Sequence, residues 1–477
     1  MSEKTNMRHS QSKVHAGRHA VRRLTPPGVL AAVVLAFTAV ACNPDHILKV
    51  DDPDVAQPSQ LSGKESLPTQ LAGALGDFQV AYSGTGNGPE GLVNVGGLLT
   101  DEFEFTESFP TRIVIDQRKT HVDRNNSTLR DIYFNAQRAR VSAERASDQY
   151  NQFDAGAAGH AEALNVVGYS DLMLAESYCS GVAFTETDAD GNFTSTTPLT
   201  TQQMLTIAAA NFDSAMTIAT AAGDAEQEQL ARVGKARALV DMGRSNLPEA
   251  AATVQPVTDD FAYLIFHSTN SSRQYNGVWE LMWNEGRWGQ ADNEGTNGLP
   301  FRSAGDPRTP FEDLGRGFSQ GTRLFGTDKY AARESNVVLA SGTEARLIEA
   351  EAALDGGDVP GWLGILNALR ANSGLALAPL ADPGTPDERV KLMFSERAFW
   401  LYATGHRLGD LRRMARAVAS GGYGFPTESV FPTGQWFFAG RPASDYGTDV
   451  NLPIPIEEDN NPESNSKNPG GCIDELP

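Results

Sequence analysis

Apolar residues recur every three or four positions through long parts of the chain, and this spacing predicts amphipathic α-helices. Residues 128–143 show the pattern clearly, with Leu129, Ile132, Tyr133 and Ala136 on one stripe. The same spacing predicts further helices over residues 61–82, 158–178, 202–222, 226–242, 248–254, 337–354 and 361–372. Paired helices of this length predict a mostly α fold, a tetratricopeptide-like helical repeat scaffold, although no strict repeat consensus is visible.

A helical hairpin is predicted over residues 385–414. Thr385 supplies an N-cap hydroxyl, Pro386 suits the first helical position, and Glu388 completes a capping box. Gly405 offers the left-handed C-cap that lets the chain reverse into a second helix. We interpret the many charged residues of this hairpin as a solvated face with structural ion pairs.

Helical periodicity fades in two stretches, about residues 261–330 and 421–450, where Gly and Pro accumulate and a few short strands are expected. Aromatic side chains cluster there, and a ring on an irregular loop can stack on the apolar face of a sugar or peptide. The run Gly286–Gly289 argues against a buried strand or helix around Trp288. The candidate ligand-binding residues of this loop-rich region are Tyr275, Trp283, Arg287, Trp288 and Trp436. A hydrophobic cluster beneath long loops is the alternative interpretation.

The formal net charge is −21, and the basic N-terminal segment makes the remainder more acidic still. An acidic surface repels nucleic acid and offers no basic patch for anionic lipid. Nucleic-acid binding is therefore excluded as a function.

Residues 1–41 are predicted to be a lipoprotein signal peptide. A basic segment ending at Arg23 precedes the apolar run 29–40, which is too short for a comfortable membrane span. The run ends in Ala39-Val40-Ala41-Cys42, and small residues before a cysteine resemble a lipobox. We therefore predict that Cys42 is lipidated; a plain signal peptide is the alternative.

Residues 42–60 are rich in Pro and Asp and are predicted to form an extended tether, which one domain over residues 61–477 follows. Beyond the leader, no stretch of the sequence is apolar enough to span a membrane. The lipid on Cys42 is therefore expected to be the membrane anchor, with any protein partner adding to it.

Two short motifs suggest ligands that their context does not support. Gly86, Gly88 and Gly91 match G-x-G-x-x-G, but no strand precedes them, so they indicate a loop. The segment from Glu186 resembles a calcium loop, but its twelfth position is Thr197, so a β-turn between short strands is the better interpretation. With no H-E-x-x-H and no C-x-x-C, the sequence predicts no metal site and no cofactor.

A third motif raises the question of catalysis. Residues 317–321 fit G-x-S-x-G around Ser319, and Asp328 and His406 follow in the order of a serine hydrolase. The nucleophile elbow needs a strand before the serine and a helix after it, and the sequence supplies no convincing helix. We therefore predict no catalytic residue and a protein that is not an enzyme.

Cys179 and Cys472 are the two cysteines left once Cys42 is assigned to the lipid. An exported protein meets an oxidising compartment, where a disulfide between them would tie the C-terminal tail to a scaffold helix. Two separate thiols are the alternative, and we favour the bridge.

The order of charged and aromatic residues resembles a known family at scattered points from residue 42 to the end. Glu396-Arg397, His406-Arg407 and Asp410-Leu411-Arg412-Arg413 are similar in order and spacing to the C-terminal signature of the SusD/RagB family. The family also resembles this chain at Asp101-Glu102, at Asp306-Pro307-Arg308 and in the ending Leu452-Pro453-Ile454-Pro455 with its later Asn-Pro pairs.

The resemblance implies a bundle of four degenerate helical repeats and a non-enzymatic function. Members of the SusD/RagB family are outer-membrane nutrient-binding lipoproteins. It implies a protein lipid-anchored in the outer membrane that captures an oligosaccharide or peptide and delivers it to a SusC-like TonB-dependent transporter. The cell surface is the expected location, and the periplasmic face is the alternative. The scaffold helices would form the transporter interface, and the loop-rich region would contact the ligand. A helical-repeat scaffold lipoprotein without any ligand is the alternative.

Overall fold

The computed structural model describes residues 63–187, 193–195, 197–437, 442–461 and 471–477. The predicted signal peptide, Cys42 and the tether lie outside the described residues, as does the centre of the calcium-like segment. The described residues belong to one compact unit. The mostly α fold predicted from the periodicity is confirmed, because the described residues contain thirteen α-helices and only short strands.

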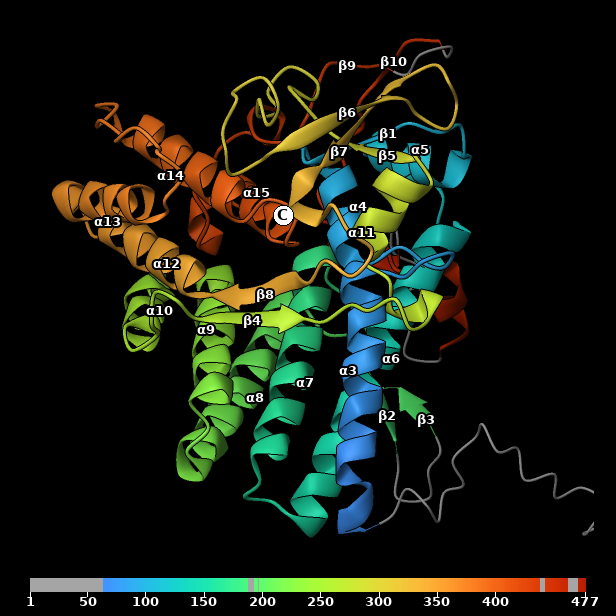
Figure 1. The fold of residues 1–477 in the computed structure, drawn as a ribbon, viewed down its shortest axis with the longest axis vertical. Coiled ribbons are helices and arrows are strands. Elements are labelled where there is room, and N and C mark those ends of the chain that lie inside the picture. Colours follow the sequence, from blue (N-terminus) through green and yellow to red (C-terminus); the bar gives the residue numbers. More distant parts are fainter. Residues whose placement is uncertain (1–62, 188–192, 196, 438–441, 462–470) are drawn as a thin grey trace, which may run out of the picture. The chain divides into compact units, whose positions relative to one another are not determined.

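Five long helices form the first part of the scaffold and pack against one another in chain order (Figure 1). They are α3 (Leu67–Ser83), α6 (Ser127–Phe153), α7 (Ala158–Ser177), α8 (Thr201–Ala222) and α9 (Ala225–Met242). Phe212 of α8 fits between Gly168 of α7 and Gly234 of α9, where an added Cβ would lie 2.8 Å and 2.4 Å from its ring. Small residues therefore allow these helices to approach one another closely.

Local capping residues fix the ends of these helices. Asn126 accepts hydrogen bonds from the backbone N–H groups of Thr128 and Leu129 at the start of α6. Thr200 forms a capping box with Gln203 at the start of α8. Gly223 ends α8 in the left-handed region, with φ 73°, so that α9 can run back beside it.

The remaining scaffold helices follow after a loop-rich segment. They are α10 (Leu247–Val254), α12 (Gly342–Asp355), α13 (Val359–Asn372), α14 (Pro386–Trp400) and α15 (Arg407–Ala415). The predicted hairpin and its N-cap are confirmed, because Thr385 accepts from the N–H of Glu388. The predicted C-cap was wrong: α14 ends at Trp400 with Leu401 as its C-cap, and Gly405, with φ 74°, lies in the turn before α15. The helix predicted from residue 337 was wrong in its first five residues, which form strand β8 because their backbone pairs with a distant strand.

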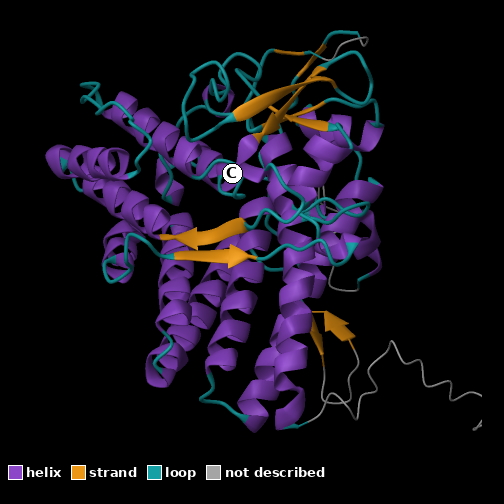
Figure 2. Cartoon of the chain, viewed as in Figure 1, coloured by secondary structure: helices purple, strands orange, loops and turns teal. Residues whose placement is uncertain are grey.

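Short two-stranded antiparallel sheets account for the strands of the described residues (Figure 2). The pairs are β1 (Phe103–Phe105) with β5 (Trp288–Gln290), β2 (Thr185–Thr187) with β3 (Phe193–Ser195), β4 (Ala262–Ile265) with β8 (Val337–Ser341), β6 (Phe311–Arg316) with β7 (Arg323–Thr327), and β9 (Gln435–Trp436) with β10 (Ser444–Asp445). The strands β2 and β3 match the interpretation of the calcium-like segment as a turn between short strands. Most of the others gather above the helices with the loops that connect them.

The charged residues near the junction of α14 and α15, from Glu396 to Arg413, are buried, so the interpretation of a solvated face was wrong there. Asp387, Glu388 and Lys391, in the first turns of α14, are exposed. Arg397 bonds Asp410 at 2.9 Å, and Arg413 bonds both Asp410 at 2.7 Å and Glu351 at 2.5 Å. Glu396 forms ion pairs with Arg308, at 2.8 Å, and with Arg370, at 2.7 Å. Burial without partners would be costly for an ion. The buried ions named above are paired, and the buried Arg412 donates to the carbonyls of Ala175 and Glu176 instead. The ion pairs themselves were expected.

A neighbouring set of buried charges joins the hairpin to the first helices. Arg407 bonds Asp101 at 2.6 Å, and Glu102 accepts the N–H of Ala403 at 2.8 Å. His406 lies 3.0 Å from Glu344. The Asp101-Glu102 pair is therefore structural.

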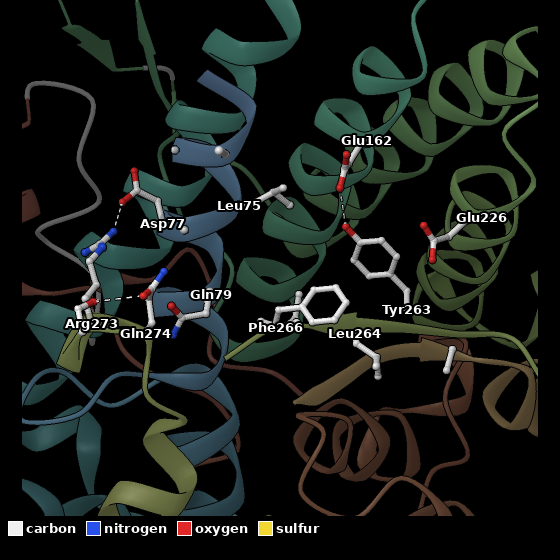
Figure 3. A pocket seen from close by; sticks show the side chains of 16 residues that line it. Leu75, Asp77, Gln79, Glu162, Glu226, Tyr263, Leu264, Phe266, Arg273 and Gln274 are labelled. Carbon is white, nitrogen blue, oxygen red and sulfur yellow. Dashed lines mark hydrogen bonds and ion pairs between the residues drawn. The ribbon is translucent and has the colours of Figure 1, made fainter. Parts of the chain in front are cut away.

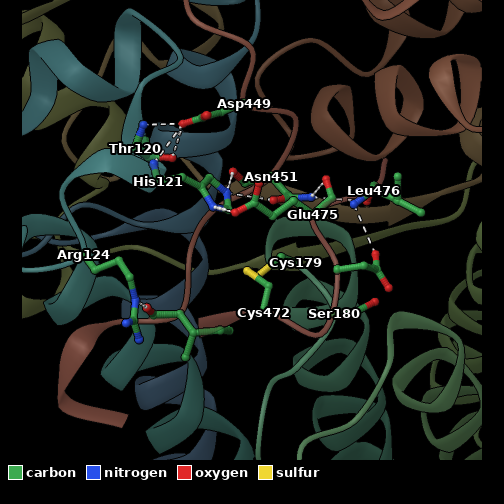
Figure 4. Close-up of a disulfide and its surroundings, with 12 residues drawn as sticks. Thr120, His121, Arg124, Cys179, Ser180, Asp449, Asn451, Cys472, Glu475 and Leu476 are labelled. Atoms are coloured by element: carbon green, nitrogen blue, oxygen red, sulfur yellow. Dashed lines mark hydrogen bonds and ion pairs between the residues drawn. A yellow bond between two sulfur atoms is a disulfide. The ribbon is translucent and has the colours of Figure 1, made fainter. Parts of the chain in front are cut away.

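A disulfide joins Cys179, just after α7, to Cys472 in the C-terminal tail (Figure 4). The two residues are separated by 293 positions in the sequence, with a Cα–Cα distance of 5.7 Å. A hydrogen bond near the disulfide also holds the tail: Asn451 Nδ2 donates to the carbonyl of Glu475 at 3.0 Å. The bridge favoured from the sequence is present. None of the helices within the described ranges is long and apolar enough to cross a membrane.

Candidate functional site

A groove of about 560 Å³ opens on the loop-rich face, and we call it the loop-face groove. One wall is the end of the π-helical segment η6 (Glu280–Asn284) with the turn that follows it. The other wall is the β6–β7 hairpin. A π-helical turn leaves the regular backbone pattern, and such turns are frequent at functional sites.

Two aromatic rings border this groove. One edge of the Trp283 ring is packed on Gly326, and its indole Nε1 donates to the carbonyl of Thr327 at 3.2 Å, which fixes the ring. Phe318, at the tip of the hairpin, is 53% exposed. The guanidinium carbon of Arg287 lies 4.9 Å from the centre of the Phe318 ring, so a cation–π contact helps to hold it. A fixed ring and an exposed ring therefore line one groove.

Polar side chains accompany the rings. Glu285 bonds Arg287 at 2.9 Å, and partial burial raises the pKa of the Glu285 carboxyl although Arg287 opposes the shift. Asn284 Nδ2 donates to Glu280 at 2.7 Å, and Arg316 donates to the carbonyl of Gln320 at 2.6 Å. Carboxylate, amide and guanidinium groups thus stand beside the rings, and these groups can hydrogen-bond hydroxyls of a ligand.

The groove is held together by the segment after β1. The carbonyl of Thr106 accepts a hydrogen bond from the hydroxyl of Ser319 at 2.9 Å. The N–H of Thr106 donates to the carbonyl of Arg287 at 2.8 Å. Phe318 N–H donates to the carbonyl of Gly286 at 2.7 Å. An added Cβ at Gly317 would lie 2.6 Å from Thr106, so the close contact requires glycine there. Thr106 therefore holds both walls of the groove, the β6–β7 hairpin and the turn after η6, in place.

Of the five predicted ligand-binding residues, Trp283 lines the groove, and Arg287 lies beside it in contact with the Phe318 ring. Tyr275 lies apart, half-buried between Gly86 and the guanidinium of Arg333, whose carbon is 4.5 Å from the ring centre. Its ring is already covered by the protein.

Trp288 and Trp436 are core residues, and the expectation that they stack on a ligand is corrected. Trp288 lies on β5, is 0% exposed and packs edge-on against Phe105, so the expectation of an irregular loop was wrong. Pairing with β1, far away in the sequence, creates this strand. Trp436 is 2% exposed, and its indole donates to Asp116 at 3.0 Å.

Phe318, Arg316, Asn284 and Glu285 are among the groove residues that sequence reasoning missed. The G-x-S-x-G motif drew attention to Ser319 alone, yet the same motif places a large ring in a tight turn. An aromatic residue between glycines of a hairpin turn was the available signal, since such a side chain has few neighbours to cover it.

The hydrolase constellation is not assembled. Ser319 lies in the turn between β6 and β7, and no helix follows it, so the nucleophile elbow is missing. His406 is buried in the scaffold, where it contacts Thr404, Arg237 and Glu344. The one potential metal-ligand group of the described residues, His121, Cys472 and Glu475, includes a sulfur that is already bound in the disulfide.

Neither a family model nor a curated protein matches the chain significantly. Its fold is similar to solved structures of SusD-like proteins. A SusD superfamily protein from Parabacteroides distasonis aligns with a TM-score of 0.60 at 14% identity, over 84% of this chain and 98% of that one. A SusD-like carbohydrate binding protein from Bacteroides fragilis gives 0.56 at 16% identity, over 84% and 98%. A SusD/RagB family protein from Bacteroides thetaiotaomicron gives 0.53 at 13% identity, over 73% and 87%. The predicted resemblance is thus confirmed as a shared fold.

Proposed function

We propose that this SusD-fold chain is a nutrient-binding lipoprotein that captures an oligosaccharide in the loop-face groove. The observation that carries the proposal is the pair of rings, Trp283 and Phe318, which border one open groove beside polar side chains. A similar solved structure is that of a SusD-like carbohydrate binding protein, which supports a sugar as the ligand.

The chemistry of the groove suits a sugar. The apolar face of a pyranose ring stacks on an aromatic ring, and its hydroxyls need donors and acceptors placed around it. Trp283 supplies a ring that the protein holds in place, so little conformational entropy is lost when a ligand stacks on it. Asn284, Glu285 and Arg316 line the same groove and supply an amide, a carboxylate and a guanidinium.

The proposed protein acts at the outer membrane. Lipidation at Cys42 would anchor it, and residues 42–60 would tether the domain to the cell surface. It would hand its ligand to a SusC-like TonB-dependent transporter that contacts the scaffold helices. The proposal includes no catalytic residue and no cofactor, and structural neighbours described as binding proteins support a role outside catalysis.

Ligand binding tests the groove. The purified chain is screened on a glycan array, and the best oligosaccharide is titrated by calorimetry against the wild type, Trp283→Ala and Phe318→Ala. We expect each variant to bind roughly tenfold or more weakly, since a buried stacking ring dominates such contacts. Phe134→Ala on α6, where the ring is 38% exposed and outside the groove, is the matched control. Unchanged affinity in both groove variants would reject the site.

Co-purification tests the partner. Tagged full-length protein is extracted from outer membranes in detergent, and its companions are identified by mass spectrometry. A stoichiometric β-barrel transporter supports delivery. Recovery of the protein alone, together with no glycan binding, would instead favour the helical-repeat scaffold without a ligand.

A further inference from the structure

A second, larger groove of about 950 Å³ lies on the scaffold side, and we call it the β4 groove (Figure 3). Helix α3 forms one side, strand β4 and Phe266 form the other, and Glu162 and Glu226 stand at one end. It shares no lining residue with the loop-face groove. An inference about it is therefore independent of the proposed sugar site.

Strand β4 presents an unpaired edge along this groove. Its only partner among the described strands is β8. At the two ends of the pairing, Phe261 O accepts from Gly342, and His267 N donates to Asn336. Hydrogen-bonding direction alternates along an antiparallel strand, so the backbone groups of Leu264 point away from β8.

The other edge of this two-stranded sheet, on β8, is covered by the protein, whereas the edge on β4 is open. The carbonyl of Val338 on β8 accepts the hydroxyl of Tyr82 at 3.2 Å. An open strand edge that lines a groove is a template for another extended chain, and natural proteins usually shield such edges unless they use them.

The side chains around the edge leave room for a ligand and offer it apolar surface. Phe266 is 73% exposed and stands with Leu264 and Leu75 in the middle of the groove. Helix α3 carries Gly73 and Gly76 on this side, and a Cβ added to either would meet nothing within 4 Å. The middle of the β4 groove is thus apolar and open.

The charge of the groove is uneven. At one end Arg273 pairs with Asp77 at 2.6 Å. At the other end the carboxylates of Glu162 and Glu226 have no cationic partner within the described part of the chain, and Glu162 accepts only the hydroxyl of Tyr263, at 2.9 Å. Burial raises the pKa of Glu162, and the negative charge of Glu226 adds to the shift. A cationic group placed there would relieve this repulsion.

We propose that the β4 groove binds an extended peptide, which adds to β4 as a third strand and places a Lys or Arg side chain between Glu162 and Glu226. The backbone of the peptide pairs with the free edge of β4. Its apolar side chains contact Phe266 and Leu75. This inference goes beyond the proposed sugar binding and does not depend on it.

Fluorescence anisotropy of the full chain tests strand addition with one probe and two altered probes. The probe is fluorescein-labelled Ser-Val-Lys-Val-Thr-Val-Ser amide, and we expect saturable binding. One altered probe carries N-methyl groups on alternate residues, which removes donors that the β4 edge needs; the other carries Glu in place of Lys. We expect each to bind about tenfold or more weakly. Equal binding of the N-methylated probe would mean that the groove accepts some other ligand shape, and it would overturn the inference.

Variants of the protein locate the binding. Gly76→Phe fills the groove from α3 and improves helix propensity, so the fold is retained while binding is lost. Glu162→Gln with Glu226→Gln weakens binding of the Lys probe about tenfold and leaves the Glu probe no weaker. Trp283→Ala, in the other groove, leaves the probe affinity unchanged. Peptide binding that persists in Gly76→Phe, or no binding of the probe to the wild type, would reject the proposal, whereas loss of sugar binding alone would leave it standing.

Discussion

The α14–α15 junction and the loop-face groove use similar residue types in opposite ways. At the junction, Arg397 and Asp410 are buried and bonded to each other and to further charges. In the groove, Arg316 is bonded to a backbone carbonyl and Phe318 is half-exposed. Buried charges that satisfy one another fix the geometry of the scaffold, whereas side chains with incomplete protein contacts remain able to meet a ligand.

The comparison explains why a charge-rich motif marks the fold and not a site of chemistry. Although burial opposes the shift, the guanidinium groups of Arg397 and Arg413 lower the pKa of Asp410 well below its usual range. A carboxylate held this firmly ionised neither gives nor takes a proton near neutral pH. The motif therefore acts by locking α14, α15 and α12 together.

The largest expected effect follows from breaking this lock. Arg397→Ala leaves Asp410 buried with one cation fewer, and we expect a loss of about 3–5 kcal/mol in the free energy of unfolding. Urea denaturation followed by circular dichroism measures it. Arg389→Ala, on the same helix but in a surface pair with Asp382, is the matched control and should leave the transition midpoint where it was. Equal, small effects of both substitutions would show that the junction charges are not a lock.

The disulfide gives the next largest effect. Replacing Cys179 and Cys472 together by Ser frees the tail, and we expect a loss of roughly 2–5 kcal/mol in the free energy of unfolding. The same loss should appear when the wild type is fully reduced. Sugar affinity should stay the same, because the bridge lies in the scaffold. A reduced wild type as stable as the oxidised one would contradict the prediction.

Another buried carboxyl of the scaffold, that of Asp171, differs from Asp410 because no cation contacts it directly. Asp171 on α7 accepts from Asn211 at 2.9 Å, and burial raises its pKa to about 8 although Arg140 opposes the shift. Between about pH 4, the ordinary pKa of an aspartate in the unfolded chain, and about pH 8, Asp171 is protonated in the folded state and ionised in the unfolded state. This group therefore lowers stability as the pH rises from about 4 to about 8, by up to roughly 1.4 kcal/mol for each pH unit.

Asp171→Asn removes that dependence. Between pH 5 and 8 we expect the variant to lose less stability than the wild type, since the amide has no proton to release. Urea titrations at several pH values measure the difference between the two slopes. Parallel pH profiles would show that Asp171 is ionised in the folded state. Asp131→Asn, at an exposed position on α6, serves as the control.

The smallest effect on stability belongs to the loop face. Phe318→Ala should change the free energy of unfolding by no more than about 0.5 kcal/mol, because the ring is already 53% exposed. Calorimetric unfolding measures it. Its effect on sugar affinity should be far larger than its effect on stability, the reverse of Arg397→Ala. A strong loss of stability would place Phe318 with the structural residues instead.

The helical scaffold was largely predictable from the sequence. The segments predicted at 202–222 and 226–242 correspond to α8 (Thr201–Ala222) and α9 (Ala225–Met242). Thr385 marked the start of the hairpin correctly, because capping depends on residues within one turn, but Gly405 did not mark the end of α14, whose C-cap is Leu401. The candidate site was predicted less well: Trp283 lines the groove and Arg287 contacts Phe318 beside it, but Trp288 and Trp436 are in the core.

The sequence by itself determined the helices, their caps, the acidic character of the chain and the resemblance in its charged motif, since each of these is encoded within a few neighbouring residues. The tertiary structure alone decided which aromatic residues are buried. Pairing of β1 with β5 buried Trp288, and pairing of β4 with β8 turned the predicted start of a helix into a strand. Strand partners and burial depend on residues far apart in the chain, and only their contacts in space separate a core ring from a ring that meets a ligand.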